Sequence, residues 1–379
     1  MIYADANGSL PLLPEVKDYL ATRIPAPLYA NPNAIHSLGN KIKVGMEKCR
    51  MLCAGVLGAM PSQVIWTSGA SESLAMIFHH LLLPVKPAKT VIYCSPIEHA
   101  AVIAAMSYYQ KVWNYDVRYL PVDVDGLVDV SWLEAQNHDH TAAVVCMAAN
   151  NETGVIQPWE RIRDFAKLVR VPFVCDTTQI IGRMPFNFQE SGLDWAMASG
   201  HKLGALPGSG FLLARDAGYM QPLIFGGGQE NGLRGGTQNY LGVETLAVAM
   251  QTFATKLARM PMMEAWRRDF EASLPKGAVV IGAKYPRLPG TSLIGFPGLH
   301  GQGIQIELES QDIFVTTSSA CSDNEPATSK VLRAMNVDDV LGRSVIRVSL
   351  PLSATEADYQ HLARVLQTSY AKLTRIKAY

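Results

Sequence analysis

The sequence predicts an α/β fold, in which a mainly parallel sheet is covered by helices. Short, continuously apolar runs such as 142–147 and 171–175 indicate strands that are buried on both faces. These runs alternate along the chain with longer segments that read as helices. The chain has 379 residues, of which 48% are hydrophobic, so it can form one large domain and a smaller one.

The elements of the large domain follow from this alternation. A turn-rich loop at 31–36 precedes a helix over 42–57, which ends near Gly58. Apolar runs then predict strands at 63–67, 90–94, 117–122, 142–147, 171–175 and 195–199. The expected helices lie at 71–83, at 99–109, from Trp159 onward and at 239–259, the last of which leads out of this region.

The remainder of the chain predicts a smaller α+β domain. Strands are expected at 278–281, 292–296 and 344–349, and helices at 300–309 and 355–373. Residues 1–14 are short and interrupted by Gly8, Pro11 and Pro14. We therefore expect a large domain over 15–259 and a small domain formed by 1–14 and 260–379.

Composition and charge narrow the functional class. Lys+Arg (33) balance Asp+Glu (33), so charge gives no support for direct nucleic-acid binding. The longest apolar stretches are too short for a membrane span, and the first residues do not form a secretory signal. Six cysteines in a chain of this length indicate no disulfide framework. Cys49 and Cys53 are better interpreted as core residues of a helix than as half of a metal site. We expect a cytoplasmic protein without a metal.

A lysine follows the last strand of the predicted parallel sheet. Residues 195–199 read as a buried strand that runs into Ser199-Gly200-His201-Lys202. A lysine in a desolvated site loses its proton readily and can form a Schiff base. On this tetrapeptide alone, a surface lysine after a strand is the better interpretation. Two further segments favour the chemical one.

The first segment is a small-residue turn, Ser68-Gly69-Ala70-Ser71, which follows a strand and opens a helix. Backbone N–H groups and the helix dipole at such a turn suit a phosphate, although an ordinary tight turn looks the same. The second is Asp176, at the carboxyl edge of the sheet, which could also be a helix N-cap. With Lys202, the aspartate matches a pyridoxal-phosphate site, in which the carboxylate keeps the pyridine nitrogen protonated.

Several motifs occur together along the chain, and each alone could be chance. They are Asn31-Pro32 with His36, Thr67-Ser68-Gly69-Ala70-Ser71-Glu72, Glu98-His99, Asn150-Asn151-Glu152-Thr153-Gly154, Asp176-Thr177-Thr178-Gln179, Ser199-Gly200-His201-Lys202, Arg234-Gly235-Gly236-Thr237, Ser319-Ala320-Cys321 and Arg347-Val348-Ser349-Leu350. In this order, the chain resembles the cysteine desulfurases of the iron–sulfur-cluster and nitrogen-fixation type. These are class V members of the fold type I pyridoxal-phosphate enzymes, and the resemblance covers nearly the whole chain.

The resemblance implies a role for each site residue. Lys202 would hold pyridoxal 5'-phosphate and later move the α-proton of the substrate, while His99 would stack on the ring and assist proton transfer. Asp176 would pair with the pyridine nitrogen, and Arg347 would bind the substrate carboxylate together with Asn151. The remaining cofactor contacts would be Asn151 and Gln179 at the phenolic oxygen, and Ala70, Ser71, Ser199 and His201 at the phosphate. Thr237 would reach the phosphate of a neighbouring subunit, which implies a homodimer.

The resemblance also implies a reactive cysteine. Cys321 lies in a polar segment of small residues, 316–326, unlike the setting of a structural cysteine, and sulfur chemistry needs an accessible thiolate. The small domain would carry this cysteine. Its thiolate would take sulfur from L-cysteine, release L-alanine and carry a persulfide to an acceptor protein. The spacing between Cys321 and Val331-Leu332-Arg333 resembles the long-loop subgroup, which passes sulfur directly to partners.

Some positions depart from the family pattern. Gly8-Ser9-Leu10-Pro11 stands in place of the usual Ala-Thr-Thr-Pro. Ser318 replaces a usual glycine, Gly235 a usual serine and Pro351 a common glycine. The chain also ends at Tyr379, without the longer extension of housekeeping members. None removes a catalytic residue. They lead us to expect a specialised acceptor, for example in DNA phosphorothioation or tRNA thiolation, in place of general iron–sulfur cluster assembly.

Two other functions fit parts of the pattern. A class V aminotransferase or selenocysteine lyase would share Lys202 and Asp176 but would need no persulfide on Cys321. A non-catalytic partner protein could keep the fold alone. The joint presence of Lys202, Asp176, His99, Cys321 and Arg347 argues against that second alternative, because nothing structural requires all five.

Overall fold

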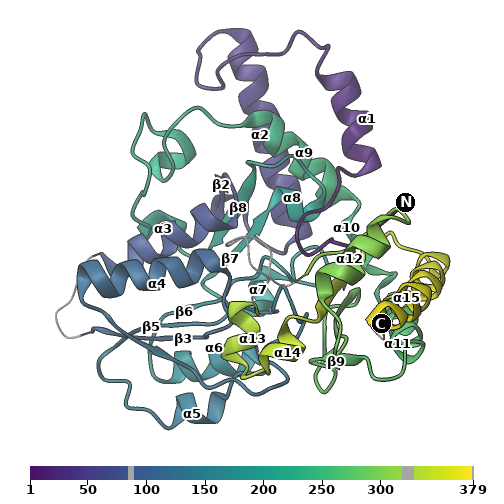
Figure 1. Cartoon of the computed structure of the whole chain (residues 1–379). Coiled ribbons are helices and arrows are strands. Elements are labelled where there is room, and N and C mark those ends of the chain that lie inside the picture. The colour runs from purple at the N-terminus through teal and green to yellow at the C-terminus, as the bar shows by residue number, and fades with distance from the viewer. Residues whose placement is uncertain (84–88, 318–327, 378–379) are drawn as a thin grey trace.

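The computed structural model describes residues 1–83, 89–317 and 328–377 (Figure 1). The strands are β1 (Ile2–Tyr3), β2 (Val64–Thr67), β3 (Val91–Cys94), β4 (Asp116–Tyr119), β5 (Thr141–Val145), β6 (Phe173–Val174), β7 (Trp195–Ser199), β8 (Gly210–Ala214), β9 (Val279–Ile281), β10 (Thr291–Gly295), β11 (Ile313–Phe314) and β12 (Val345–Ser349). The α-helices are α1 (Pro14–Arg23), α2 (Ser37–Val56), α3 (Ala70–Leu82), α4 (Ala100–Trp113), α5 (Val130–Glu134), α6 (Trp159–Leu168), α7 (Phe188–Ser191), α8 (Gly200–Leu203), α9 (Tyr240–Gln251), α10 (Phe253–Leu257), α11 (Met260–Ala272), α12 (Gly301–Glu309), α13 (Lys330–Ala334), α14 (Asp339–Gly342) and α15 (Glu356–Lys377).

The central layer consists of two groups of strands that meet edge to edge. Strands β4, β3, β5 and β6 pair in parallel in that spatial order. Strand β8 lies between β2 and β7 and is antiparallel to both. The Thr177 hydroxyl, just after β6, joins the groups: it donates to the Met197 carbonyl on β7 and accepts the Met197 N–H, both at 2.8 Å. The layer is therefore mainly parallel, with one antiparallel strand.

Successive side chains of these strands enter two different cores. In β3, Tyr93 packs into the core formed with α1, α2, α6 and α9, whereas Ile92 and Cys94 pack into the core formed with α3 and α4. Side chains alternate between the faces of a strand, so a strand with both faces buried has no polar face. Figure 1 shows α3 and α4 on one side of the sheet and α5, α6 and α7 on the other. The predicted α/β class is confirmed.

A separate core lies in the later part of the chain. There β10 pairs antiparallel with β9 and β12, and the helices α11, α12 and α15 pack around this sheet. Strand β1 pairs in parallel with β11, and Ile2 and Ala4 belong to the same core. We infer that this core marks the small domain expected from 1–14 and 260–379, although Leu12 and Leu13 pack against the large core. No described helix is both long and apolar enough to cross a membrane.

The segment 2–13 connects the two regions. The Ala6 N–H donates to the Ser349 carbonyl on β12 at 2.8 Å, so the segment first follows the small sheet. The Leu10 N–H donates to the His201 carbonyl at 2.7 Å, and the Leu13 N–H donates to the Gly204 carbonyl at 3.0 Å. Between these anchors, the segment passes directly over the turn that carries Lys202.

Several details differ from the elements expected from sequence. Strand β8 and helices α1 and α11 were not predicted. The helix expected over 239–259 is interrupted at Thr252, which separates α9 from α10. The helix expected over 42–57 begins earlier, at Ser37, because His36 caps it: the His36 Nδ1 accepts the Gly39 N–H at 3.2 Å.

Candidate active site

A cavity of about 210 Å³ opens at the carboxyl ends of the parallel strands. The turns that follow β2, β3, β5, β6 and β7 all contribute side chains to it, which is where ligands bind in open α/β sheets. The lining residues are Gly8, Ala70, Ser71, Leu74, His99, Met147, Ala149, Asn151, Asp176, Thr178, Gln179, Ser199, His201 and Lys202. The cavity thus gathers residues from five strand ends and from the segment 2–13.

One end of the cavity is an anion cradle between β2 and α3. Gly69 has φ +152°, a conformation that side chains rarely adopt, and a Cβ there would lie 3.1 Å from the Ser199 Oγ. The Ala70 N–H at the start of α3 donates to the Ser199 Oγ at 2.8 Å. Outside the cradle, Glu72 accepts the Ser68 N–H at 2.9 Å and pairs with Arg234 at 2.8 Å. A helix N-terminus with small residues around it suits a phosphate.

The Lys202 amine lies under the segment 2–13. It donates to the backbone carbonyl of Asn7, and to that of Gly8 at 2.6 Å. Burial lowers the pKa of Lys202 from 10.5 to about 7, and the positive charges of Arg183 and Arg347 act in the same direction. A substantial fraction of this amine is therefore neutral and nucleophilic at pH 7.

On the floor of the cavity, Asp176 follows β6 and is 7% exposed. Its Oδ1 accepts the Thr178 N–H at 2.9 Å, which fixes the carboxylate. Gln179 donates through Nε2 to the Asn7 carbonyl at 3.1 Å. The Gln179 Oε1 and the Thr178 Oγ1 are buried without a partner among the described residues. A polar ring at this position would satisfy them, so the side chains fit pyridoxal phosphate.

His99 is the N-cap of α4 and lines the cavity. Its Nδ1 accepts the Ala101 N–H at 3.2 Å, so the neutral ring carries its proton on Nε2. Partial desolvation, together with the positive charge of Lys202, lowers the pKa of His99, although Asp176 opposes this effect. The adjacent Glu98 is buried, and its Oε1 accepts the Met147 N–H at 2.6 Å. Burial raises the pKa of Glu98 to about 8, so a neutral carboxyl group anchors this turn.

Arg347 on β12 lies outside the set of residues that line the cavity, and it is 8% exposed. Its Nη1 donates to the Asn151 carbonyl at 3.1 Å, and its Nη2 donates to the Asp5 Oδ1 at 2.5 Å. The Nε is buried without a partner among the described residues. The guanidinium therefore adjoins the cavity through Asn151 but is engaged by Asp5.

The structure brings together most of the site predicted from sequence. Ala70, Ser71, His99, Asn151, Asp176, Gln179, Ser199, His201 and Lys202 line one cavity. Thr237 is exposed and does not line it, and Cys321 lies outside the described residues. Sequence reasoning missed Asn7 and Gly8, which contact Lys202 through backbone carbonyls, because such contacts leave no mark in residue type. The described residues contain no cluster of His, Cys, Asp and Glu that could hold a metal ion.

Comparison with known proteins points to one group. The family model for class-V aminotransferases matches residues 2–362. A cysteine desulfurase of Trichormus variabilis is 34% identical over 100% of this chain and 94% of its own length. A solved NifS-like protein superposes with a TM-score of 0.88 at 33% identity, covering 98% of this chain and 99% of that one. A structure of SspA in complex with cysteine superposes with a TM-score of 0.81 at 27% identity, covering 94% and 100%.

Proposed function

The chain belongs to the class-V aminotransferase family and, within it, to the cysteine desulfurases, and we propose that it removes sulfur from L-cysteine with pyridoxal 5'-phosphate as cofactor. The observation that carries the proposal is the position of Lys202, whose pKa is lowered to about 7, in the same cavity as Asp176. L-Cysteine as the substrate is supported by the cysteine bound in the SspA structure. The products are L-alanine and a persulfide.

The cofactor is held by the residues of the cavity. Lys202 would hold its aldehyde carbon, Asp176 would pair with its pyridine nitrogen, and Asn151 and Gln179 would bond its phenolic oxygen. The cradle formed by Ala70, Ser71, Ser199 and His201 would hold its phosphate, because the N-terminus of α3 favours an anion. When bound, pyridoxal phosphate supplies an electron sink for the carbon next to the substrate amine.

The chain's own groups move protons and orient the substrate. The free Lys202 amine would be a base close to neutral pH, which suits it to accept the α-proton and return it. His99 adds a second proton carrier at Nε2. The two terminal nitrogens of Arg347 bind the substrate carboxylate, which takes the place of the Asp5 carboxylate next to Asn151.

The sulfur step is assigned to Cys321. Its thiol loses a proton, and the thiolate attacks the substrate sulfur. An S–S bond forms as the bond between carbon and sulfur breaks, and the electron pair of that bond stays with carbon, which takes up a proton. The result is alanine and a persulfide on Cys321, so atoms and electrons balance without an outside oxidant.

The proposal includes a homodimer in the cytoplasm and a protein acceptor. Thr237 is exposed and away from its own cavity, which supports a role at the cofactor phosphate of a second subunit. Free thiols at the described cysteines support a reducing compartment. The departures at Gly8, Ser318, Gly235 and Pro351 support a specialised acceptor, as in DNA phosphorothioation or tRNA thiolation. Tight binding to a purified iron–sulfur scaffold would contradict that last point.

The decisive experiment uses the purified holoenzyme and L-cysteine. We expect alanine to form, and the peptide that contains Cys321 to gain the mass of one sulfur atom. Cys321→Ala should lose both alanine formation and the added sulfur. Cys49→Ala, a change in α2 and far from Cys321 in sequence, should lose neither. Transfer of the amino group to a keto acid without a persulfide would replace the proposal with an aminotransferase.

A further inference from the structure

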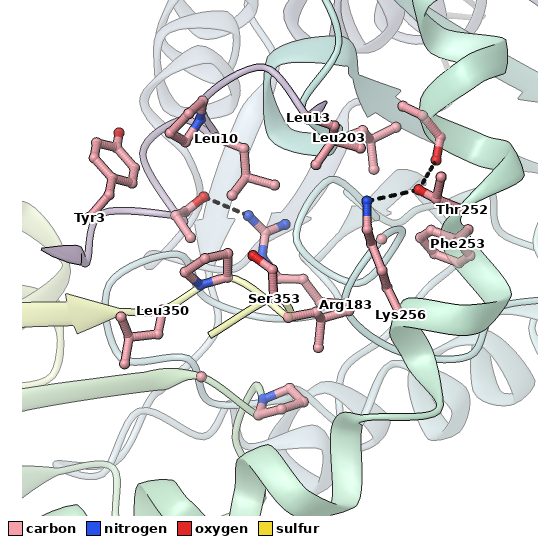
Figure 2. Close-up of a pocket in the computed structure, with 18 of the residues that line it drawn as sticks. Tyr3, Leu10, Leu13, Arg183, Leu203, Thr252, Phe253, Lys256, Leu350 and Ser353 are labelled. Carbon is pink, nitrogen blue, oxygen red and sulfur yellow. Dashed lines mark hydrogen bonds between the residues drawn. The ribbon is translucent and has the colours of Figure 1, made fainter. Parts of the chain in front are cut away.

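A second cavity, of about 200 Å³, lies on the other side of the segment 2–13 (Figure 2). It shares no lining residue with the cavity that contains Lys202. Ala6 and Asn7 line the second cavity, whereas Gly8 lines the first, so a single stretch of backbone separates the two. The second cavity is formed where the large and small cores meet, between α8, α9, α10, α11 and the end of β12.

The wall of this cavity is largely apolar. Its aliphatic and aromatic side chains include Leu10, Leu13, Leu203, Phe253, Met263 and Leu350. For comparison, an apolar cavity of about 150 Å³ accommodates a benzene molecule. The space is therefore large enough for a chain or ring of about six carbons together with a small polar group.

One charged side chain points into this apolar space. Arg183, which lines the cavity, is 8% exposed. Its Nη2 donates to the Ala6 carbonyl at 2.7 Å, and its Nη1 is buried without a partner among the described residues. Figure 2 shows the guanidinium directed into the cavity and the bond to Ala6. Burial lowers the pKa of Arg183 to about 10, and among the described residues no carboxylate offsets this effect.

The other buried arginines of the described chain are different in this respect. Arg23 pairs with Glu244 at 2.9 Å, and Arg267 and Arg287 pair with Glu271 at 3.1 and 2.8 Å. Arg347 pairs with Asp5. A buried cation without an anion is costly, so proteins normally supply one. Arg183 is thus an exception that an anionic ligand would resolve.

A second cation stands at the far wall. The Lys256 Nζ donates to the Thr252 Oγ1 at 2.9 Å and lies 3.7 Å from the Glu15 carboxylate. This ion pair offsets the Lys256 charge, so Arg183 is the lining cation that has no acidic partner among the described residues. Together, the apolar wall and the Arg183 guanidinium favour a ligand that has an apolar body and a negative group.

We propose that this cavity is a second binding site, which takes a small amphipathic carboxylate. The carboxylate accepts hydrogen bonds from the Arg183 guanidinium, and the alkyl or aryl part packs among Leu10, Leu13 and Leu203. Leu10 and Pro351 also contribute to the wall.

The two cavities are coupled through the segment that separates them. Ala6 accepts from Arg183, and the next two carbonyls, of Asn7 and Gly8, accept from Lys202. The positive charge of Arg183 also lowers the pKa of Lys202. A carboxylate bound to Arg183 offsets that charge, so binding raises the affinity of Lys202 for its proton. The ligand thereby influences Lys202 from the second cavity, without contacting the substrate.

The test is a calorimetric titration of the holoenzyme with hexanoate, acetate and 1-hexanol at constant ionic strength. Hexanoate should bind saturably and raise the melting temperature. Acetate lacks the alkyl chain and 1-hexanol lacks the carboxylate, so each should bind at least tenfold more weakly than hexanoate. Arg183→Met should bind hexanoate at least tenfold more weakly than the parent, whereas its affinity for 1-hexanol should change little. Leu10→Thr, which removes apolar surface from the wall, should weaken hexanoate more than acetate.

Three results would overturn the proposal. They are the absence of saturable hexanoate binding, equal affinities for acetate and hexanoate, and an Arg183→Met protein that binds hexanoate as the parent does. The last would show that hexanoate binds elsewhere on the protein. Should Arg183→Met fail to fold, Leu13→Trp decides, because its indole fills the cavity: retained hexanoate affinity in that variant also overturns the proposal. None of these readouts depends on desulfurase activity.

Discussion

Replacing Lys202 by methionine should change the way in which stability depends on pH. The pKa of Lys202 is about 7 in the folded protein against 10.5 for an ordinary lysine. The folded state therefore binds fewer protons than the unfolded state between these values, and the stability of the parent protein rises with pH across this window. Below about pH 7 both states are protonated, and this contribution is at its most unfavourable.

The size of the effect follows from the shift. Each pKa unit corresponds to about 1.4 kcal/mol, so the shift of Lys202 amounts to about 5 kcal/mol of destabilisation at acidic pH. Between pH 7 and pH 9 the parent should recover about 2 kcal/mol relative to Lys202→Met, which lacks the titrating amine. At pH 7 the variant should be the more stable protein, less a part lost because the Asn7 and Gly8 carbonyls no longer have a donor.

The assay is urea unfolding of both proteins without cofactor at pH 6, 7, 8 and 9, with refolding from urea as the check of reversibility. Lys48→Met, a change in an exposed lysine of α2, is the matched control for the loss of one positive charge. Parallel stability curves for the parent and Lys202→Met between pH 7 and pH 9 would show that the amine is not desolvated, and the reasoning would fail.

Three further predictions concern the surroundings of the site. Gly69→Ala should cost about 1–3 kcal/mol, because its φ of +152° is unfavourable with a Cβ, and cofactor should be lost on dialysis; full retention of the cofactor absorbance would contradict this. Glu98 has a pKa of about 8, above its ordinary 4.5, so its contribution to stability is lost as pH rises through 8. The difference in melting temperature between Glu98→Gln and the parent should therefore shift in favour of the variant from pH 5.5 to 8.5. Arg347→Lys should raise KM for L-cysteine about tenfold or more through loss of the two-pronged contact, whereas Asp5→Asn should lower KM by freeing the guanidinium; an unchanged KM in both variants would exclude this role for Arg347.

The sequence was most informative where a local pattern determines the element. Strand β7 has the predicted bounds, Trp195–Ser199, since its five residues are apolar or small and end at a turn. Residues at the carboxyl ends of such strands must meet at one edge of the sheet, which is why Asp176 and Lys202 could be placed in one site. The resemblance to the cysteine desulfurases is likewise confirmed.

Contacts between distant segments could not be predicted in the same way. Asp5 and Arg347 pair across 342 positions of sequence, and the carbonyls of Asn7 and Gly8 hold Lys202 whatever their side chains are. That Arg183 has no acidic partner in the described part of the chain depends on the packing of several elements. Such features come from tertiary structure, which neither periodicity nor motif spacing encodes. The roles of Thr237 and Cys321 remain predictions.

The path of the segment 2–13 has a consequence for biosynthesis. Its residues leave the ribosome before those with which they pair, since β1 pairs with β11 at Ile313–Phe314, and Ala6 bonds to Ser349 on β12. At about 5–20 residues per second, these partners emerge many seconds later. The large sheet can assemble during that interval, but the segment 2–13 can take its full path over Lys202 only after β11 and β12 have emerged. Maturation of the lysine site therefore follows synthesis of these two strands.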